Sequence, residues 1–225
     1  MQDQYADLDW PDGRTPVSRQ FADPYFSVDD GLAETAHVFL AGNDLPARFG
    51  GEFRIAELGF GTGLNLLVTW AAWVAAGRPG TLTFTSFEAF PMAPADRAQA
   101  LAAFPTLAAL ADQLCAATTS GLGTHDLAPN LTLQIISGDA RDTLPLWQGQ
   151  ADAWFLDGFS PAKNPQMWGD DLLEQVARHT RPDGTAATYT AAGHVRRGLA
   201  AAGFAVARVP GYGRKRHMTS ARMPQ

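Results

Sequence analysis

Residues 53–76 read FRIAELGFGTGLNLLVTWAAWVAA, and this stretch decides the fold. Residues 53–58 are β-prone, residues 59–63 carry three alternate glycines, and residues 64–76 form a long apolar run. This order is typical of a strand, a tight turn and a buried helix. The apolar run is shorter than the ~20 residues that span a bilayer, so we expect no membrane association.

The same alternation continues along the chain. We expect further strands at residues 82–88, 131–137, 151–156, 185–189, 204–209 and 217–223. Helices are expected between them, at residues 95–115 with a break at Pro105, 140–147, 170–179 and 192–202. Strands that alternate with helices indicate a doubly wound α/β fold with a mostly parallel sheet, because each parallel crossover needs a connection long enough for a helix.

Composition limits the alternatives. The chain has 225 residues, 46% of them hydrophobic, and no Pro/Ser-rich spacer, so we expect a single domain over residues 1–225. Cys115 is the only cysteine, which excludes an internal disulfide and favours a reducing, cytoplasmic location. Residues 1–10 are acidic and unlike a signal peptide. The five histidines form no pair at metal-ligand spacing, so we expect no metal.

Charge is distributed unevenly along the chain. The net charge is -6, yet seven basic residues and no acidic residue follow Asp183. Such a change of sign is a hint of a face that binds nucleic acid or another anion. Arginines that merely pair with surface carboxylates would give the same pattern.

Glycines follow the first expected strand, where ligands of a doubly wound sheet bind. Gly59, Gly61 and Gly63 allow a tight turn and a close approach of a ligand to the backbone. A dinucleotide fingerprint would need a further glycine where Leu64 stands. The turn therefore favours a nucleoside ligand without a pyrophosphate.

Acidic residues stand at successive strand ends. Glu57 could attract a ligand's ammonium group, Glu88 could accept hydrogen bonds from ribose hydroxyls, and Asp139 could accept one from an adenine amine. Asp157 follows the fourth expected strand. Taken singly, each acid is more simply a solvated strand end or a helix cap. Their recurrence favours a shared site.

Over residues 53–189 these features resemble the class I S-adenosylmethionine-dependent methyltransferases. The resemblance implies a seven-stranded, Rossmann-like sheet and S-adenosylmethionine as the cofactor. Glu57, Gly59, Gly61, Gly63, Glu88, Asp139 and Asp157 would then bind it.

Longer motifs narrow the family. Residues 155–168 read FLDGFSPAKNPQMW, residues 21–27 read FADPYFS, residues 87–91 read FEAFP and residues 211–216 read GYGRKR. Over about residues 22–223 the chain resembles the methyltransferase domains of the tRNA 5-methylaminomethyl-2-thiouridine biosynthesis proteins of the MnmC family, and their free-standing relatives. The resemblance implies N-methylation of 5-aminomethyl-2-thiouridine at the tRNA wobble position. It also implies an FAD-dependent oxidase, fused or separate, that supplies the amine.

The amine that this family is expected to methylate must first lose a proton, because an alkylammonium has no lone pair with which to attack a methyl group. We expect Asp157 to hold the amine and act as the catalytic residue. An N-terminal extension of about residues 1–50 would help to form the site. The expected substrate contacts are Tyr25, Phe26, Glu34, Phe159, Lys163 and Asn164. The expected tRNA contacts are Arg196, Arg197, Arg214, Lys215 and Arg216.

Two other functions fit the sequence. The first is an N-methyltransferase or aminopropyltransferase-like enzyme acting on a small free amine. The second is an inactive RNA-binding protein with the same fold. The basic C-terminal segment favours an RNA substrate over a free amine, and the full set of strand-end acids argues against lost activity.

Overall fold

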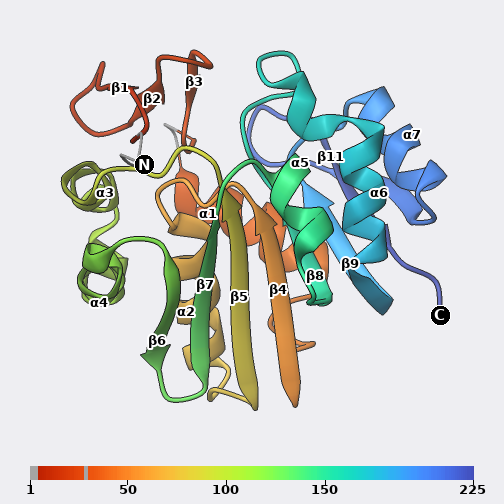
Figure 1. Ribbon diagram of the computed structural model, residues 1–225, viewed down its shortest axis with the longest axis horizontal. Coiled ribbons are helices and arrows are strands. Elements are labelled where there is room, and N and C mark those ends of the chain that lie inside the picture. Colours follow the sequence, from red (N-terminus) through yellow and green to blue (C-terminus); the bar gives the residue numbers. More distant parts are fainter. Residues whose placement is uncertain (1–4, 28–29) are drawn as a thin grey trace.

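A computed structural model describes residues 5–27 and 30–225 (Figure 1). Residues 1–4 and 28–29, which belong to the expected domain and its N-terminal extension, lie outside the described part. The strands are β1 (Leu8–Asp9), β2 (Val17–Ser18), β3 (Asp23–Pro24), β4 (Glu52–Leu58), β5 (Thr81–Glu88), β6 (Gly123–Ala128), β7 (Leu131–Ser137), β8 (Ala151–Leu156), β9 (Thr180–Thr188), β10 (Ala205–Pro210) and β11 (His217–Arg222).

The α-helices are α1 (Gly31–Thr35), α2 (Leu64–Ala75), α3 (Pro94–Leu101), α4 (Ala108–Ala117), α5 (Ala140–Thr143), α6 (Asp170–Arg178) and α7 (Gly193–Ala201). A π-helical turn, η1 (Ala36–Leu40), continues α1. Short 3₁₀ segments are η2 (Ala41–Asn43), η3 (Pro105–Leu107), η4 (Thr118–Ser120), η5 (Leu144–Leu146) and η6 (Pro165–Trp168). In the described part of the chain no single helix is long and apolar enough to cross a membrane; the bent pair Pro94–Leu101 and Pro105–Ser120 passes that test jointly, on length and composition.

The central sheet has the order β10-β11-β9-β8-β4-β5-β7-β6. Strands β7, β5, β4, β8 and β9 run in parallel, whereas β6, β11 and β10 pair in antiparallel fashion with their neighbours. The predicted doubly wound, mostly parallel sheet is confirmed. The predicted number of seven strands is wrong, because β6 adds an eighth strand among the described residues. Its sequence, GTHDLA, has too few apolar residues to show the strand pattern.

Two expected boundaries also shift. The helix expected at residues 140–147 ends at Thr143, and η5, with a proline near its start, replaces the rest. Strand β9 begins at Thr180 rather than residue 185, because its pairing with β8 shifts register between Ala151 and Ala153. The bulge absorbs residues 181–184, where Asp183 adopts a positive φ of 61°.

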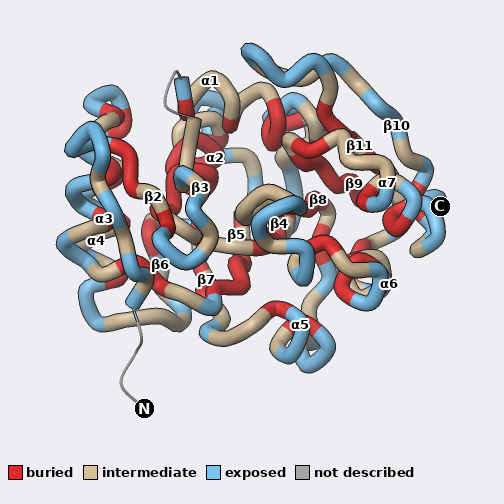
Figure 2. Tube along the Cα trace, turned by 90° about the horizontal axis from the view of Figure 1, so that it is seen from above, coloured by how far each residue is buried: buried red, intermediate tan, exposed pale blue. Residues whose placement is uncertain are grey.

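Helices cover both faces of the sheet (Figures 1 and 2). One core contains Ile55, Phe84 and Phe155 with α2 and α4, and the other contains Leu58 and Trp154 with α6 and α7. Since side chains alternate along a strand, odd-numbered residues of β4 and β8 face α2. This parity determines which strand-end acids can meet.

The N-terminal segment forms a separate three-stranded sheet, β1-β2-β3, that was not expected from the sequence. It lies beyond the carboxyl ends of the central strands in Figure 1. Each of its strands has two residues, too few to show a periodic pattern.

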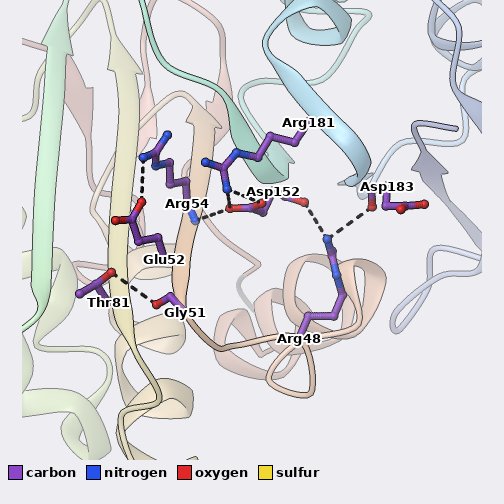
Figure 3. Close-up of polar contacts among 8 residues, drawn as sticks. All are labelled: Arg48, Gly51, Glu52, Arg54, Thr81, Asp152, Arg181 and Asp183. Atoms are coloured by element: carbon purple, nitrogen blue, oxygen red, sulfur yellow. Dashed lines mark hydrogen bonds and ion pairs between the residues drawn. The ribbon is translucent and has the colours of Figure 1, made fainter. Parts of the chain in front are cut away.

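The opposite end of the sheet is held by Asp152, at the start of β8 (Figure 3). Its Oδ2 accepts a hydrogen bond from the Arg54 N–H at 2.8 Å, and its Oδ1 pairs with Arg181 Nη1 at 3.1 Å. Arg48 Nη2 donates to the Asp152 carbonyl at 3.0 Å. The side chain of Asp152 is 17% exposed, so these bonds join β4, β8 and β9 with little competition from water.

We predict that Asp152→Ala lowers the free energy of unfolding by about 2 kcal/mol, because it leaves the part-buried Arg54 N–H and the Arg181 guanidinium without this acceptor. The matched control is Glu52→Ala, whose carboxylate pairs with Arg54 but is 72% exposed and should cost less than about 0.5 kcal/mol. Urea denaturation measures both. Equal losses for the two variants would contradict the role of Asp152.

Candidate active site

A cavity of about 680 Å³ lies at the carboxyl ends of β4, β5 and β8. The sheet order reverses between β4 and β8, since the chain continues from β4 to β5 on one side and reaches β8 on the other. The loops after these two strands approach closely: a Cβ placed on Gly59 would lie 3.6 Å from the Gly158 Cα. The cavity is therefore at the topological switch point, where ligands of such sheets bind.

Strand register brings the acids together. Glu57 of β4 pairs with Ser86 of β5 and Phe155 of β8. Glu88 and Asp157 lie two residues beyond these partners, so all three acids project toward the face covered by α2. The sequence-predicted convergence of Glu57, Glu88 and Asp157 is thus present, although their surroundings differ.

Glu88 lines the cavity and holds the glycine turn in place. Its Oε2 accepts a hydrogen bond from the Gly61 N–H at 2.8 Å, and its Oε1 accepts one from the Phe90 N–H at 2.7 Å. Burial raises the pKa of Glu88, and these two N–H groups oppose that rise. Each oxygen retains a lone pair, as an acceptor for two ribose hydroxyls requires.

Glu57 is not among the described residues that line the cavity, and its expected contact with a ligand's ammonium stays a prediction. It is 1% exposed and accepts hydrogen bonds from Asn65 Nδ2 at 2.9 Å and Ser86 Oγ at 2.7 Å. Burial raises its pKa well above the usual carboxyl range. Its position in the strand register directs its side chain toward the start of α2, where it contacts Asn65.

Asp157 lines the cavity and is half-buried. Its Oδ1 accepts a hydrogen bond from the Gly158 N–H at 2.8 Å and its Oδ2 one from Asn65 Nδ2 at 2.7 Å. Burial raises its pKa to about 6, against the effect of these two donors. A carboxyl that titrates near neutrality can both hold an amine and exchange a proton with it.

The glycine turn serves two purposes. Gly59 and Gly61 line the cavity with positive φ values of 84° and 53°. Gly63 is not among the residues that line it, and a Cβ there would lie 2.8 Å from Leu114 Cδ2, inside the core, so its expected cofactor contact stays a prediction. Gly63 is required for packing of the helix start against α4.

Asp139 caps α5 at the cavity edge. Its carboxylate accepts a hydrogen bond from the backbone N–H of Arg141 at 2.9 Å. It also forms an ion pair with the Arg141 guanidinium, in which Nη2 lies 2.6 Å from Oδ2. The hydrogen bonds from the Arg141 side chain hold the pKa of Asp139 below its usual range. Asp139 lines the cavity, and its expected contact with an adenine amine stays a prediction. Arg141 lines the cavity too, which the sequence did not indicate.

Aromatic rings form one wall of the cavity. Phe159 stacks on Phe21 with centroids 4.7 Å apart, and Tyr25 meets the Phe159 ring edge-on at 5.1 Å. Phe26 also lines the cavity and packs edge-on against Phe104 at 4.9 Å. The expected aromatic residues are therefore at the site, and Phe21 joins them.

Lys163 is not among the described residues that line the cavity, and its expected substrate contact stays a prediction. Its Nζ pairs with Asp23 Oδ1 at 2.9 Å and donates to the Ala22 carbonyl. Asp23 Oδ2 also accepts the Ser160 N–H at 2.9 Å. Lys163 thus fastens the N-terminal segment to the loop after β8, while Asn164, which donates its N–H to the Ser160 carbonyl, does line the cavity.

Lys215 lines the cavity and is exposed to solvent, so its expected tRNA contact stays a prediction. Its Nζ lies 2.7 Å from Glu34 Oε1 and 4.2 Å from the centroid of the Tyr189 ring. Both partners line the cavity, and Tyr189 donates its hydroxyl to the Gly158 carbonyl at 2.8 Å. Glu34 is consequently at the site as expected, already paired with a lysine.

The other expected tRNA contacts separate into two groups. Arg214 lines the cavity beside Lys215, and Arg216 is exposed on the same loop. Arg196 and Arg197 lie on α7 and are not among the described residues that line the cavity. Asn65 and Tyr189 were missed; the signal for Asn65 was a lone amide within an apolar helix.

Within residues 5–27 and 30–225, no three His, Cys, Asp or Glu side chains are grouped so that they could hold an ion.

A model of the S-adenosyl-L-methionine-dependent methyltransferase family matches residues 105–224, more than half of the chain. The chain belongs to this family. The resemblance expected from the motifs at the ends of the strands is confirmed.

Among relatives of this methyltransferase, the tRNA 5-methylaminomethyl-2-thiouridine biosynthesis bifunctional protein MnmC of Chromobacterium violaceum is 48% identical over 97% of this chain and 34% of that protein. MnmC of Pseudomonas aeruginosa is 47% identical over 96% and 35%. The chain thus spans about a third of the length of these curated relatives. The narrower resemblance, to the MnmC family, is confirmed.

Solved structures agree with the fold of a methyltransferase. The crystal structure of MNMC2 from Aquifex aeolicus is 26% identical with a TM-score of 0.79, covering 100% of this chain and 73% of that one. TrmN from Thermus thermophilus, at 17% identity and a TM-score of 0.51 over 81% of this chain and 47% of that one, shows the fold alone.

The raised pKa of Asp157 should lower the stability of the folded methyltransferase at neutral and alkaline pH. A carboxyl with a raised pKa in the folded state favours folding less once pH exceeds its unfolded value near 4. We predict that Asp157→Asn increases the free energy of unfolding at pH 8 by on the order of 1 kcal/mol, and that the gain disappears as pH falls from about 6 to 4.

Urea denaturation at several pH values measures this difference. Asp112→Asn, at an exposed carboxylate on α4, is the control and should show no comparable pH dependence. A stability difference for Asp157→Asn that does not change between pH 4 and 8 would refute a raised pKa.

Proposed function

We propose that this methyltransferase transfers a methyl group from S-adenosylmethionine to the primary amine of 5-aminomethyl-2-thiouridine at the tRNA wobble position, forming 5-methylaminomethyl-2-thiouridine. The observation that carries the proposal is Asp157, a carboxylate in the same cavity as the glycine turn and Glu88. The names of the relatives that are 47–48% identical supply the nucleoside.

The residues present fit the cofactor. Glu88 would offer two carboxylate oxygens to a ribose, Asp139 would accept a hydrogen bond from the adenine amine, and Gly59 and Gly61 line the cavity with their backbone. A Cβ on Gly61 would lie 3.1 Å from the Tyr25 ring, so a side chain there would crowd this wall of the cavity. When bound, S-adenosylmethionine supplies the electrophilic methyl group.

The chain's own groups prepare the acceptor. An alkylammonium ionises near pH ~10 and carries no lone pair until it loses a proton. Asp157 is ionised above pH about 6, so at neutral pH it can hold the ammonium and accept its proton. Glu34 and the Tyr189 ring already hold the ammonium group of Lys215, which illustrates their suitability for a cation.

Several partners belong to the same proposal. The tRNA would meet the basic residues of the 211–216 loop and α7, and an FAD-dependent oxidase, fused or separate, would supply the amine. We further propose that residues 1–225 form one methyltransferase domain of the cytoplasm, in which the N-terminal extension completes the site through Tyr25, Phe26 and Glu34.

Nucleoside mass spectrometry tests the reaction. Transfer RNA that carries the unmethylated amine is incubated with the protein and S-adenosylmethionine, and we expect its mass to rise by one methyl replacing one hydrogen. Asp157→Ala should abolish the gain, because nothing then holds and deprotonates the amine. Turnover of small free amines but not tRNA would favour the alternative enzyme, and calorimetry without any cofactor binding would favour an inactive protein.

We also predict that Arg216→Ala weakens tRNA binding and reduces the slope of log Kd against log salt concentration by about one, because one phosphate contact is lost. Arg54→Ala is the matched control, since Arg54 lies at the opposite end of the sheet beside Glu52. Filter binding at several salt concentrations measures both slopes. An unchanged slope for Arg216→Ala would remove this residue from the tRNA interface.

A further inference from the structure

Asn65 stands in the first turn of α2 and is 7% exposed. Its Nδ2 donates to Asp157 Oδ2 at 2.7 Å and to Glu57 Oε1 at 2.9 Å. A primary amide has two hydrogens on this nitrogen, so each carboxylate takes one. One side chain thus joins the ends of β4 and β8 beneath the cavity.

The orientation of the amide is determined by a third contact. Asn65 Oδ1 accepts a hydrogen bond from Thr35 Oγ1, at the end of α1, at 3.1 Å. A rotated amide would direct its oxygen at two carboxyl groups and its NH₂ at a hydroxyl, which is electrostatically unfavourable. Glu57 cannot move away either, because Ser86 Oγ lies 2.7 Å from its Oε2.

Asp157 is consequently held at both oxygens, by Asn65 and by the Gly158 N–H at 2.8 Å. We infer that Asn65 is a positioning residue, whose amide fixes the Asp157 carboxylate in its charged form toward the acceptor amine. This inference deepens the proposed function and rests on it for the identity of the amine.

The hydrogen bond from Asn65 lowers the pKa of Asp157. Asn65 donates to the charged form of Asp157, so it lowers a pKa that burial raises. Removing the amide should therefore raise the pKa of Asp157 above about 6 and leave less carboxylate at neutral pH. The other charged or titratable groups near Asp157 are Glu57 from β4, Glu34 from α1, Tyr189 after β9 and Lys215 from the 211–216 loop.

The experiment compares Asn65→Leu and Asn65→Ala with the wild-type chain. Leu keeps the volume without donors, and Ala favours the helix without adding bulk. Thr69→Val is the matched control: Thr69 is fully buried one turn further along α2, and its hydroxyl donates to the Asn65 carbonyl without touching either acid. Carboxyl-carbon NMR titration follows Asp157 directly, and single-turnover methylation of tRNA is measured from pH 5 to 9.

We expect the Asp157 pKa to rise by about one unit in both Asn65 variants and to stay unchanged in Thr69→Val. The ionised fraction would then fall roughly fivefold at pH 6 and hardly at all at pH 8, so the deficit in kcat should shrink as pH rises. A purely structural role would lower kcat by the same factor at every pH.

An unshifted Asp157 titration in a folded Asn65 variant would overturn the inference. If Asn65→Leu does not fold, Asn65→Ala decides the question. The titration needs no turnover, so a wild-type protein that fails to methylate tRNA would refute the proposed function while the link between Asn65 and Asp157 is judged separately.

Discussion

The parallel pairing of β4 with β5 and with β8 determines which side chains reach the cavity. Because register aligns Glu57 with Ser86 and Phe155, the acids at these strand ends share one face of the sheet. That face is covered by the start of α2, which the glycine turn brings directly over the strand ends. A shift of one residue in either pairing would move an acid to the opposite core, among Trp154 and Leu58, and would dismantle the site.

Grouping carboxyl groups in a largely buried space is costly, and hydrogen bonds from neutral donors limit this cost at each of the three acids. Glu57 accepts hydrogen bonds from a hydroxyl and an amide, and Glu88 accepts them from two backbone N–H groups. Asp157 accepts them from an amide and a backbone N–H. Neutral donors satisfy the oxygens without cancelling their charge. The cavity therefore stays attractive to cationic ligands.

Much of this arrangement could be predicted from sequence, for local reasons. The run from Phe53 to Leu64 carries strand, turn and helix in one continuous pattern, and acids just after apolar strands mark the ligand-binding edge. Long-range pairing could not be predicted. Nothing in the sequence around Lys215 indicates that it meets Glu34, 181 residues away, and nothing near Lys163 points to Asp23. Strand β6 and the N-terminal sheet were missed because their patterns are too short or too polar.

The ion pair between Lys215 and Glu34 joins two segments from opposite ends of the sequence across the mouth of the cavity. The ammonium group of Lys215 cannot keep its ion pair with Glu34 intact while it also pairs with an anion from solvent. Any polyanion that draws Lys215 outward therefore competes with Glu34 for this ammonium group, and by reciprocity the ion pair weakens binding of that polyanion. The balance between the two contacts depends on ionic strength, because salt screens both.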